Sequence, residues 1–178
     1  LPNRAKNRIL KLLDENNIIL RKNINISSIT KGKIHCEDGE IISSDFILRA
    51  AGGIPQNWLS NTDLNLEKGF ISINQCLQST SHDFVFASGD CASIVNNPNQ
   101  KAGVFAVRAA PFLYRNIKNY ISSNKLIKYN PQKNFLQALT IDNKKALLFR
   151  GNFSIYGILP WIFKDFVDRS FIKKFYIK

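Results

Sequence analysis

The pattern of hydrophobic and polar positions predicts three helices. Apolar side chains recur at helical spacing over residues 4–13 and 101–121, so both segments are predicted to form amphipathic helices. Pro111 lies inside the second segment, where we expect either a kink or the start of a new helix. A third helix, rich in aromatic and basic residues, is predicted over 159–176.

Short apolar runs between these helices predict strands. The predicted strands cover residues 18–20, 24–29, 34–42 (a hairpin that turns at Asp38-Gly39), 45–48, 70–73, 84–87, and 135–139 with 146–149 (an antiparallel pair around Asp142-Asn143). The runs 45–48 and 84–87 each lead into glycine. This order is typical of a buried strand that ends at a ligand site.

The predicted C-terminal helix has an apolar side and a charged side. The apolar side holds Ile162, Phe163, Phe166, Val167, Phe171 and Phe175, and the charged side holds Lys164, Asp165, Asp168, Arg169 and Lys173. We expect the aromatic stripe to pack on the 135–149 hairpin and to leave a basic face exposed. The alternative is that this basic helix lies on an anionic membrane surface.

Charge is distributed unevenly along the chain. Residues 1–100 hold 10 Lys or Arg and 10 Asp or Glu, whereas residues 101–178 hold 15 and 3, so the second segment carries the whole net charge of +12. A composition rich in Lys, Asn and Ile explains much of the lysine content but not this asymmetry. The basic half therefore predicts an anionic partner: a lipid surface, a nucleic acid or an acidic domain.

The cysteine and histidine content argues against two kinds of site. Cys36, Cys76 and Cys91 form no Cys-x-x-Cys pair, and His35 and His82 are the only histidines. Neither a zinc site nor a redox dithiol is expected. Scattered thiols suit a reducing compartment, and no apolar run is long enough to cross a bilayer. We expect a cytoplasmic protein, with peripheral contact to the inner face of a membrane as an option.

The most informative motif is Phe84–Ala92. An apolar strand ends at Gly89, where the missing side chain lets the backbone approach a ligand, and Asp90 follows at the carboxyl edge of the strand. A carboxylate there can accept a hydrogen bond from a ribose or ribitol hydroxyl. The predicted helix that begins at residues 101–103 offers backbone N–H groups. Taken alone, the motif fits an Asp that caps a short turn equally well.

Several motifs in order resemble the pyridine nucleotide-disulfide oxidoreductase superfamily, in its type II NADH dehydrogenase-like branch. The matching segments are Leu48–Pro55, Gly69–Ile73, Leu77–Ser79 and Val85–Asp90, the last of which is the second FAD motif. The rest resembles a subgroup that includes domains fused to selenide, water dikinase, on Lys101–Arg108, Pro111, Tyr129–Gln132, Phe135-Leu136, Gly151–Phe153 and Trp161–Phe171. In that arrangement a kinase domain would follow Lys178.

The resemblance implies an α/β fold. The chain would be part of a flavoprotein with two dinucleotide-binding domains, for FAD and NAD(P)H, and a small α+β C-terminal region. Residues 1–76 would belong to the NAD(P)H-binding domain, 77–128 to the FAD-binding domain and 129–178 to the C-terminal hairpin and helix. Hydride would pass from NAD(P)H to the flavin and on to a second acceptor, a quinone or another small molecule.

The same resemblance implies cofactor contacts at eight residues. Gly89 and Asp90 would contact the ribitol-diphosphate region, Lys101, Ala102, Gly103 and Val104 would lie under the flavin ring, and Gly52 and Gly53 would lie at the domain junction near the nicotinamide. No residue is predicted to be a general acid or base, and no metal ligand is expected.

Two departures from the family pattern affect these expectations. Respiratory members usually carry glutamines on the flavin-side helix, but this chain has Gly103, Val107 and Arg108 there, which argues against a quinone acceptor. None of the nine glycines forms a Gly-x-Gly-x-x-Gly turn. We therefore expect both pyrophosphate-binding turns to lie upstream in a longer protein.

An alternative from another class is a non-catalytic basic module that binds nucleic acid or a membrane surface. Its support is the net charge and the interleaving of aromatic residues with lysine. No nucleic-acid-binding motif is present, so we expect an electron acceptor and no nucleic acid as the partner. A flavin spectrum would separate the two alternatives.

Overall fold

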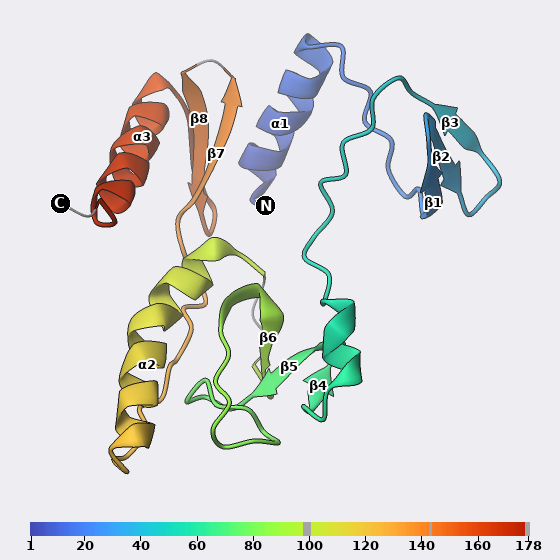
Figure 1. Ribbon diagram of the computed structural model, residues 1–178. Helices are drawn as coiled ribbons and strands as arrows, with labels where there is room; N and C mark the ends of the chain where they lie inside the picture. The colour runs from blue at the N-terminus through green and yellow to red at the C-terminus, as the bar shows by residue number, and fades with distance from the viewer. Residues whose placement is uncertain (98–100, 143, 177–178) are drawn as a thin grey trace. The chain divides into compact units, whose positions relative to one another are not determined.

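The computed structural model describes residues 1–97, 101–142 and 144–176, which form two compact units (Figure 1). The terminal unit combines Leu1–Ile47 with Lys133–Lys178, and the central unit is Leu48–Gln132.

The described residues form a mixed α/β structure, as predicted. The helices are α1 (Asn3–Glu15), α2 (Gly103–Ile121) and α3 (Ile158–Lys173), with the 3-10 turns η1 (Asn57–Asn61) and η2 (Gly89–Cys91). The strands are β1 (Ile26–Thr30), β2 (Lys33–Cys36), β3 (Ile41–Ser43), β4 (Leu66–Glu67), β5 (Phe70–Ile73), β6 (Ala92–Ile94), β7 (Gln137–Asp142), β8 (Lys145–Arg150) and β9 (Phe153–Gly157). Within the described residues, no helix is both long and apolar enough to span a membrane.

The terminal unit contains an antiparallel meander in the order β1-β2-β3. Asp38 and Gly39 form the turn between β2 and β3. The Asp38 carboxylate accepts a hydrogen bond from the Glu40 amide at 3.0 Å, and Gly39 has a φ of +91°, a conformation that favours glycine. The predicted hairpin is therefore confirmed.

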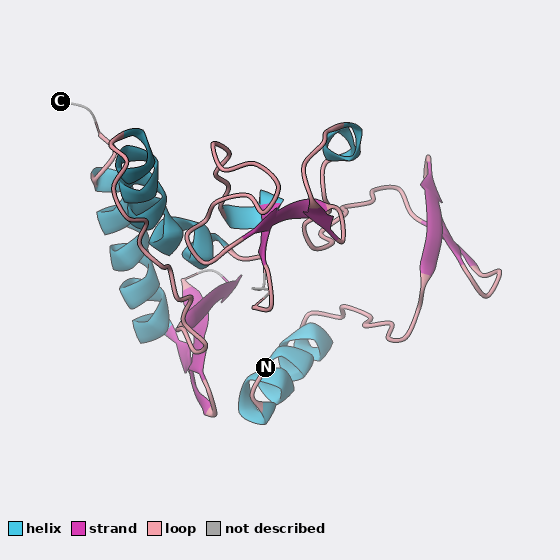
Figure 2. Cartoon of the chain, turned by 90° about the horizontal axis from the view of Figure 1, so that it is seen from below, coloured by secondary structure: helices cyan, strands magenta, loops and turns pink. Residues whose placement is uncertain are grey.

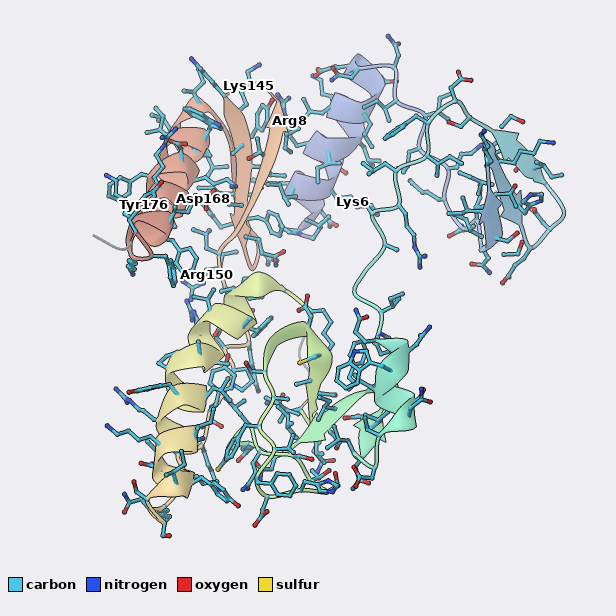
Figure 3. The ribbon with its side chains drawn as sticks, viewed as in Figure 1. Lys6, Arg8, Lys145, Arg150, Asp168 and Tyr176 are labelled. Atoms are coloured by element: carbon cyan, nitrogen blue, oxygen red, sulfur yellow. The ribbon has the colours of Figure 1, made fainter. Side chains whose placement is uncertain are left out.

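A second antiparallel sheet, β7-β8-β9, lies between α1 and α3 in the terminal unit (Figure 1). Successive side chains of a strand alternate between faces, so Leu147 and Phe149 share one face of β8, where they cluster with Ala5 of α1. Arg8, labelled in Figure 3, extends from α1 to within 4.1 Å of the Tyr156 ring centroid. The predicted antiparallel pair is confirmed as β7 and β8, and β9 is a further strand.

Helix α3 contacts β8 through a side that the sequence did not predict. Pro160 is buried and Trp161 is half-buried, whereas Phe163 and Phe166 are 48% and 69% exposed. The expectation that the aromatic stripe packs on the hairpin is therefore wrong. A single helix lays only one stripe on a sheet, and the residue of α3 that is buried is Pro160, which lies outside the predicted aromatic stripe. The predicted turn residue Asn143 lies outside the described residues.

The central unit is built from the sheet β4-β5-β6 and helix α2. Strands β5 and β6 pair in parallel, with Ile71 opposite Ala92, and β4 pairs antiparallel with β5. The core comprises Leu59, Ile71, Ile73, Leu77, Ala87, Ala92, Ile94, Ala109 and Tyr129. Helix α2 runs unbroken through Pro111, so no new helix begins there.

Three predicted strands are not formed. Residues 18–20 and 45–48 lie in loops. The whole segment from the end of β3 to the start of η1 is loop (Figure 2). Residues 84–87 make one isolated bridge, between Phe86 and Gln78. No described strand lies beside residues 18–20 or 45–48. Residues 84–87 instead pair with the loop segment 77–79, where the Ala87 amide donates to the Leu77 carbonyl at 3.0 Å and the Ser79 amide donates to the Val85 carbonyl at 2.8 Å. Phe46 is accordingly 78% exposed rather than buried.

The two compact units follow backbone contacts and do not test the predicted division into dinucleotide-binding domains, which stays a prediction. Strand β5, assigned to residues 1–76, pairs with β6 of residues 77–128. Tyr129, predicted to open the C-terminal region, is buried in the central unit, where its amide donates a hydrogen bond to the Gln75 carbonyl at 2.8 Å. Backbone hydrogen bonds thus join segments that the motifs had separated. Which dinucleotide each part binds stays a prediction.

Candidate functional site

Four of the eight predicted cofactor residues, Gly89, Asp90, Lys101 and Ala102, line a small cavity of about 30 Å³ in the central unit. It is lined by Ile73, Leu77, Ser88, Gly89, Asp90, Ala92, Ile94, Lys101, Ala102, Phe105, Ala109 and Tyr129. A volume of roughly 30 Å³ is about that of one water molecule. A dinucleotide would therefore need the exposed surface beside the cavity rather than the cavity itself.

Gly89 brings the turn η2 against helix α2. Its φ is +74°, and a Cβ atom at this position would lie 3.2 Å from the Cβ of Ala106. Both the left-handed conformation and the close approach favour glycine. The glycine that the motif singled out is thus required by the backbone, and it positions Asp90 in the same turn.

Gly53, Asp90 and Lys101 lie together beside the cavity. A Cβ atom on Gly53 would be 3.8 Å from the Lys101 Cβ and 4.0 Å from the Asp90 Oδ2. Asp90 is exposed, and its carboxylate makes no hydrogen bond within the described part of the chain. It is therefore available to accept one from a ligand. Gly52 has no neighbouring atom within 4 Å of an added Cβ, so it adjoins this cluster without contacting it.

The N-terminus of α2 forms another wall of the site. Ala102 is its N-cap residue, and the methyl side chain of this alanine makes no capping hydrogen bond. Gly103 and Val104 are the first two helical residues, and open space surrounds the position of a Cβ on Gly103. First-turn N–H groups lack partners within a helix and carry partial positive charge. This end of α2 can therefore receive an anionic or electron-rich part of a ligand.

Lys101 is the charged residue most closely integrated into the site. Its ammonium donates a hydrogen bond to the Ala92 carbonyl at 2.5 Å and lies 3.9 Å from the centroid of the Phe70 ring. Partial burial lowers the pKa of Lys101 from its ordinary value, and the nearby Asp90 opposes that shift. Lys101 is therefore a partly desolvated cation whose neighbours are the Ala92 carbonyl, the Phe70 ring and the Asp90 carboxylate.

Sequence reasoning missed two aromatic residues of this site. Phe70 stacks under Lys101 from β5, and Tyr129 lines the cavity from a segment assigned to the C-terminal region. The Tyr129 hydroxyl donates a hydrogen bond to the Phe105 carbonyl at 3.4 Å, and burial raises the pKa of this phenol. Tyr129 belonged to a matched motif, but no local signal indicated that it returns to α2.

No group of three or more potential metal ligands occurs among the described residues.

The sequence profile of the pyridine nucleotide-disulphide oxidoreductase family matches residues 1–112. The chain belongs to this family. The match includes all eight predicted cofactor residues, which lie between Gly52 and Val104. The superfamily expected from the motifs is thus confirmed, whereas its NADH dehydrogenase-like branch stays a prediction.

A solved structure supports the family fold. The chain is similar to the ferredoxin reductase for the CYP199A2 system from Rhodopseudomonas palustris, with a TM-score of 0.56 and 16% identity. The similarity covers 83% of this chain but only 37% of the reductase, so this family member spans well under half the length of that protein. At this identity the likeness concerns the fold alone. No curated protein gives a significant sequence match.

Proposed function

We propose that the protein is an FAD-dependent NAD(P)H oxidoreductase of the NADH dehydrogenase-like branch. The observation that carries this proposal is the meeting of Gly53, Asp90 and Lys101 beside Ala102, the N-cap residue of α2. All of these groups lie inside the segment that matches the family.

The residues at this site fit a flavin dinucleotide. The exposed Asp90 carboxylate can accept a hydrogen bond from a ribitol or ribose hydroxyl. Gly53 leaves the space before that carboxylate open, and the first-turn amides at Gly103 and Val104 can donate to an electron-rich cofactor edge. Bound FAD would supply the hydride-accepting group, while these residues bind and orient it.

The second substrate that we propose is a small-molecule electron acceptor. A quinone remains a candidate through the branch resemblance. On α2, Val107 and Arg108 are both exposed, and they stand where respiratory members usually carry glutamines. An acceptor other than quinone therefore suits these side chains better.

The decisive experiment is to purify the complete protein and record its absorbance spectrum. We expect flavin bands, and oxidation of NADH or NADPH with an artificial acceptor at a rate on the order of 1–100 per second. Running both nucleotides in parallel would identify the preferred donor. A colourless protein that neither takes up added FAD nor oxidises either nucleotide would refute the proposal.

Asp90 provides a residue-level test of the same site. Asp90→Ala should weaken FAD binding by about 1–3 kcal/mol, because the carboxylate accepts a hydrogen bond from the cofactor in a partly desolvated site. FAD retained after gel filtration reports the effect. Asp63→Ala removes a carboxylate that is 85% exposed in the same unit and should leave retention unchanged. Equal retention in both variants would contradict the assignment.

Two further proposals concern the location and the complete protein. We propose that it is cytoplasmic and contacts the inner face of a membrane peripherally through the basic residues 101–178 and the exposed aromatic residues of α3. The subgroup resemblance supports a selenide, water dikinase domain after Lys178. A mass and sequence determination of the complete protein tests that fusion.

A further inference from the structure

Lys101 joins three elements of the central unit at the candidate cofactor site. It stands just before the N-cap of α2, yet its ammonium reaches the Ala92 carbonyl at the start of β6 and the Phe70 ring on β5. Ala92 directly follows η2, the turn that carries Asp90. One side chain therefore connects the N-terminal end of α2 to the strand that leaves the Asp90 turn.

Ordering and partly burying a lysine at this position costs free energy. This cost indicates that the charged group makes favourable contacts that an uncharged side chain would lack. Fixing a lysine side chain costs rotamer entropy, and partial burial of the ammonium adds a desolvation penalty. An apolar side chain of similar length would fill the same space without that penalty. The charge does make contacts that such a residue would lack: the Ala92 carbonyl, the Phe70 face and the field of Asp90 and Glu67.

These contacts restrain the site in a specific way. Gly89 lets η2 approach α2, but a glycine by itself adds flexibility rather than fixing a position. The Lys101–Ala92 hydrogen bond holds the far end of that turn, and Asp90 lines the same cavity as Ala102, the N-cap residue of α2. Gly53, next to both Lys101 and Asp90, leaves that space open.

We propose that Lys101 is a positioning residue that locks the Asp90 turn onto the N-terminus of α2 and thereby raises the affinity for FAD. The role rests on the proposed function, because it concerns the same cofactor. Lys101 acts through Asp90, so the contribution of Lys101 to FAD binding depends on the Asp90 carboxylate being present.

A double-mutant cycle on the complete protein tests this dependence. The apoprotein of each variant is titrated with FAD, and the dissociation constant is read from the quenching of flavin fluorescence. Lys101→Met, which keeps the chain length and removes the charge, should weaken binding about tenfold. In the Asp90→Ala background the same change should alter the constant less than about twofold. Lys101→Arg retains the charge and the donor, and should restore most of the affinity.

Controls separate this role from general destabilisation. Lys118→Met removes an exposed lysine from the last turn of the same helix and should leave the dissociation constant unchanged. Thermal unfolding of each apoprotein shows whether the variant is folded. If Lys101→Met does not fold, the dissociation constant of Lys101→Arg is used to test the role instead. Undiminished affinity in Lys101→Met, equal losses with and without Asp90, or no rescue by arginine would overturn the positioning role. If the unaltered protein itself binds no FAD, the proposed function fails instead.

Discussion

At the scale of single residues, glycines with positive φ decide where backbones can approach one another. Gly69 has a φ of +82° in the turn between β4 and β5, and a Cβ there would lie 2.6 Å from the Pro55 Cγ. Pro55 closes the glycine turn of the candidate site. The absence of a side chain at Gly69 therefore allows that turn to rest on the sheet.

We predict that Gly69→Ala destabilises the protein by at least about 2 kcal/mol. The left-handed conformation costs an alanine about 1–2 kcal/mol, and the clash with a rigid proline ring adds an overpacking term of about 1–3 kcal/mol. Urea denaturation measures the change. Gly39→Ala is the matched control, because Gly39 also has a positive φ, +91°, but no atom within 4 Å of an added Cβ. Equal losses in the two variants would show that the Pro55 contact is unimportant.

At the scale of elements, one buried side chain attaches helix α2 to two loops. Asn116 is fully buried, and its amide nitrogen donates to the carbonyls of Cys76 and Ile127 at 2.7 and 2.8 Å. Its Oδ1 accepts a hydrogen bond from the Ile127 amide at 2.7 Å. The side chain thus satisfies three backbone groups and fixes the segment that brings Tyr129 back to the core.

Asn116→Leu should lower the free energy of unfolding by about 2 kcal/mol or more. Each buried backbone group left without a partner costs about 1–3 kcal/mol. Asn119→Ala lies on the same helix and removes one hydrogen bond, to the Lys125 carbonyl at 2.9 Å, at a more exposed position. We expect it to cost less than about 1 kcal/mol. Chemical denaturation measures the loss in the free energy of unfolding for both variants. A larger loss in Asn119→Ala than in Asn116→Leu would contradict the anchoring role.

The exposed aromatic face of α3 predicts a second behaviour at this scale. Phe166 is 69% exposed on a helix that belongs to the basic half of the chain. We expect the complete protein to sediment with vesicles that contain anionic lipid, and less so at high salt, because screening weakens attraction between exposed charges. Phe166→Ser should reduce binding, while Phe84→Ser, at a similarly exposed position in the central unit, should not. No preference for anionic over neutral vesicles would refute membrane contact.

At the scale of the whole molecule, the chain carries the predicted cofactor residues without the usual phosphate-binding turns. No Gly-x-Gly-x-x-Gly sequence is present, and large apolar side chains such as Phe46 and Leu48 are 78% exposed. In a complete flavoprotein we expect further chain to cover these side chains and to hold the pyrophosphate groups.

We therefore predict that residues 1–178 expressed alone bind FAD weakly or not at all and oxidise no NAD(P)H. The physical reason is that most dinucleotide affinity comes from the pyrophosphate at a glycine-rich turn and helix N-terminus. Absorbance at the nicotinamide band with an artificial acceptor measures the rate, and the complete protein is the positive control. Turnover of the isolated segment at the rate of the complete protein would show that the other half is dispensable.

Local patterns in the sequence were sufficient to predict the elements that are determined by interactions between residues close together in the chain. The three helices follow from the spacing of their apolar residues, and the Asp38-Gly39 hairpin follows from turn chemistry within a few residues. The Gly89-Asp90 motif likewise identified a position where backbone conformation requires glycine. The family followed from the order of such motifs along the chain.

Tertiary structure alone decided what depends on partners distant in sequence. Residues 45–48 have the composition of a buried strand but form none, because no described strand supplies their hydrogen bonds. Aromatic content alone did not indicate which side of α3 packs on β8, because Phe163 and Phe166 are exposed in the folded chain. The contacts of Lys101 with Ala92 and Phe70 arise only when α2, β6 and β5 meet. Helical and turn periodicities are local, whereas strand pairing and the surroundings of a charge are set by the folded chain.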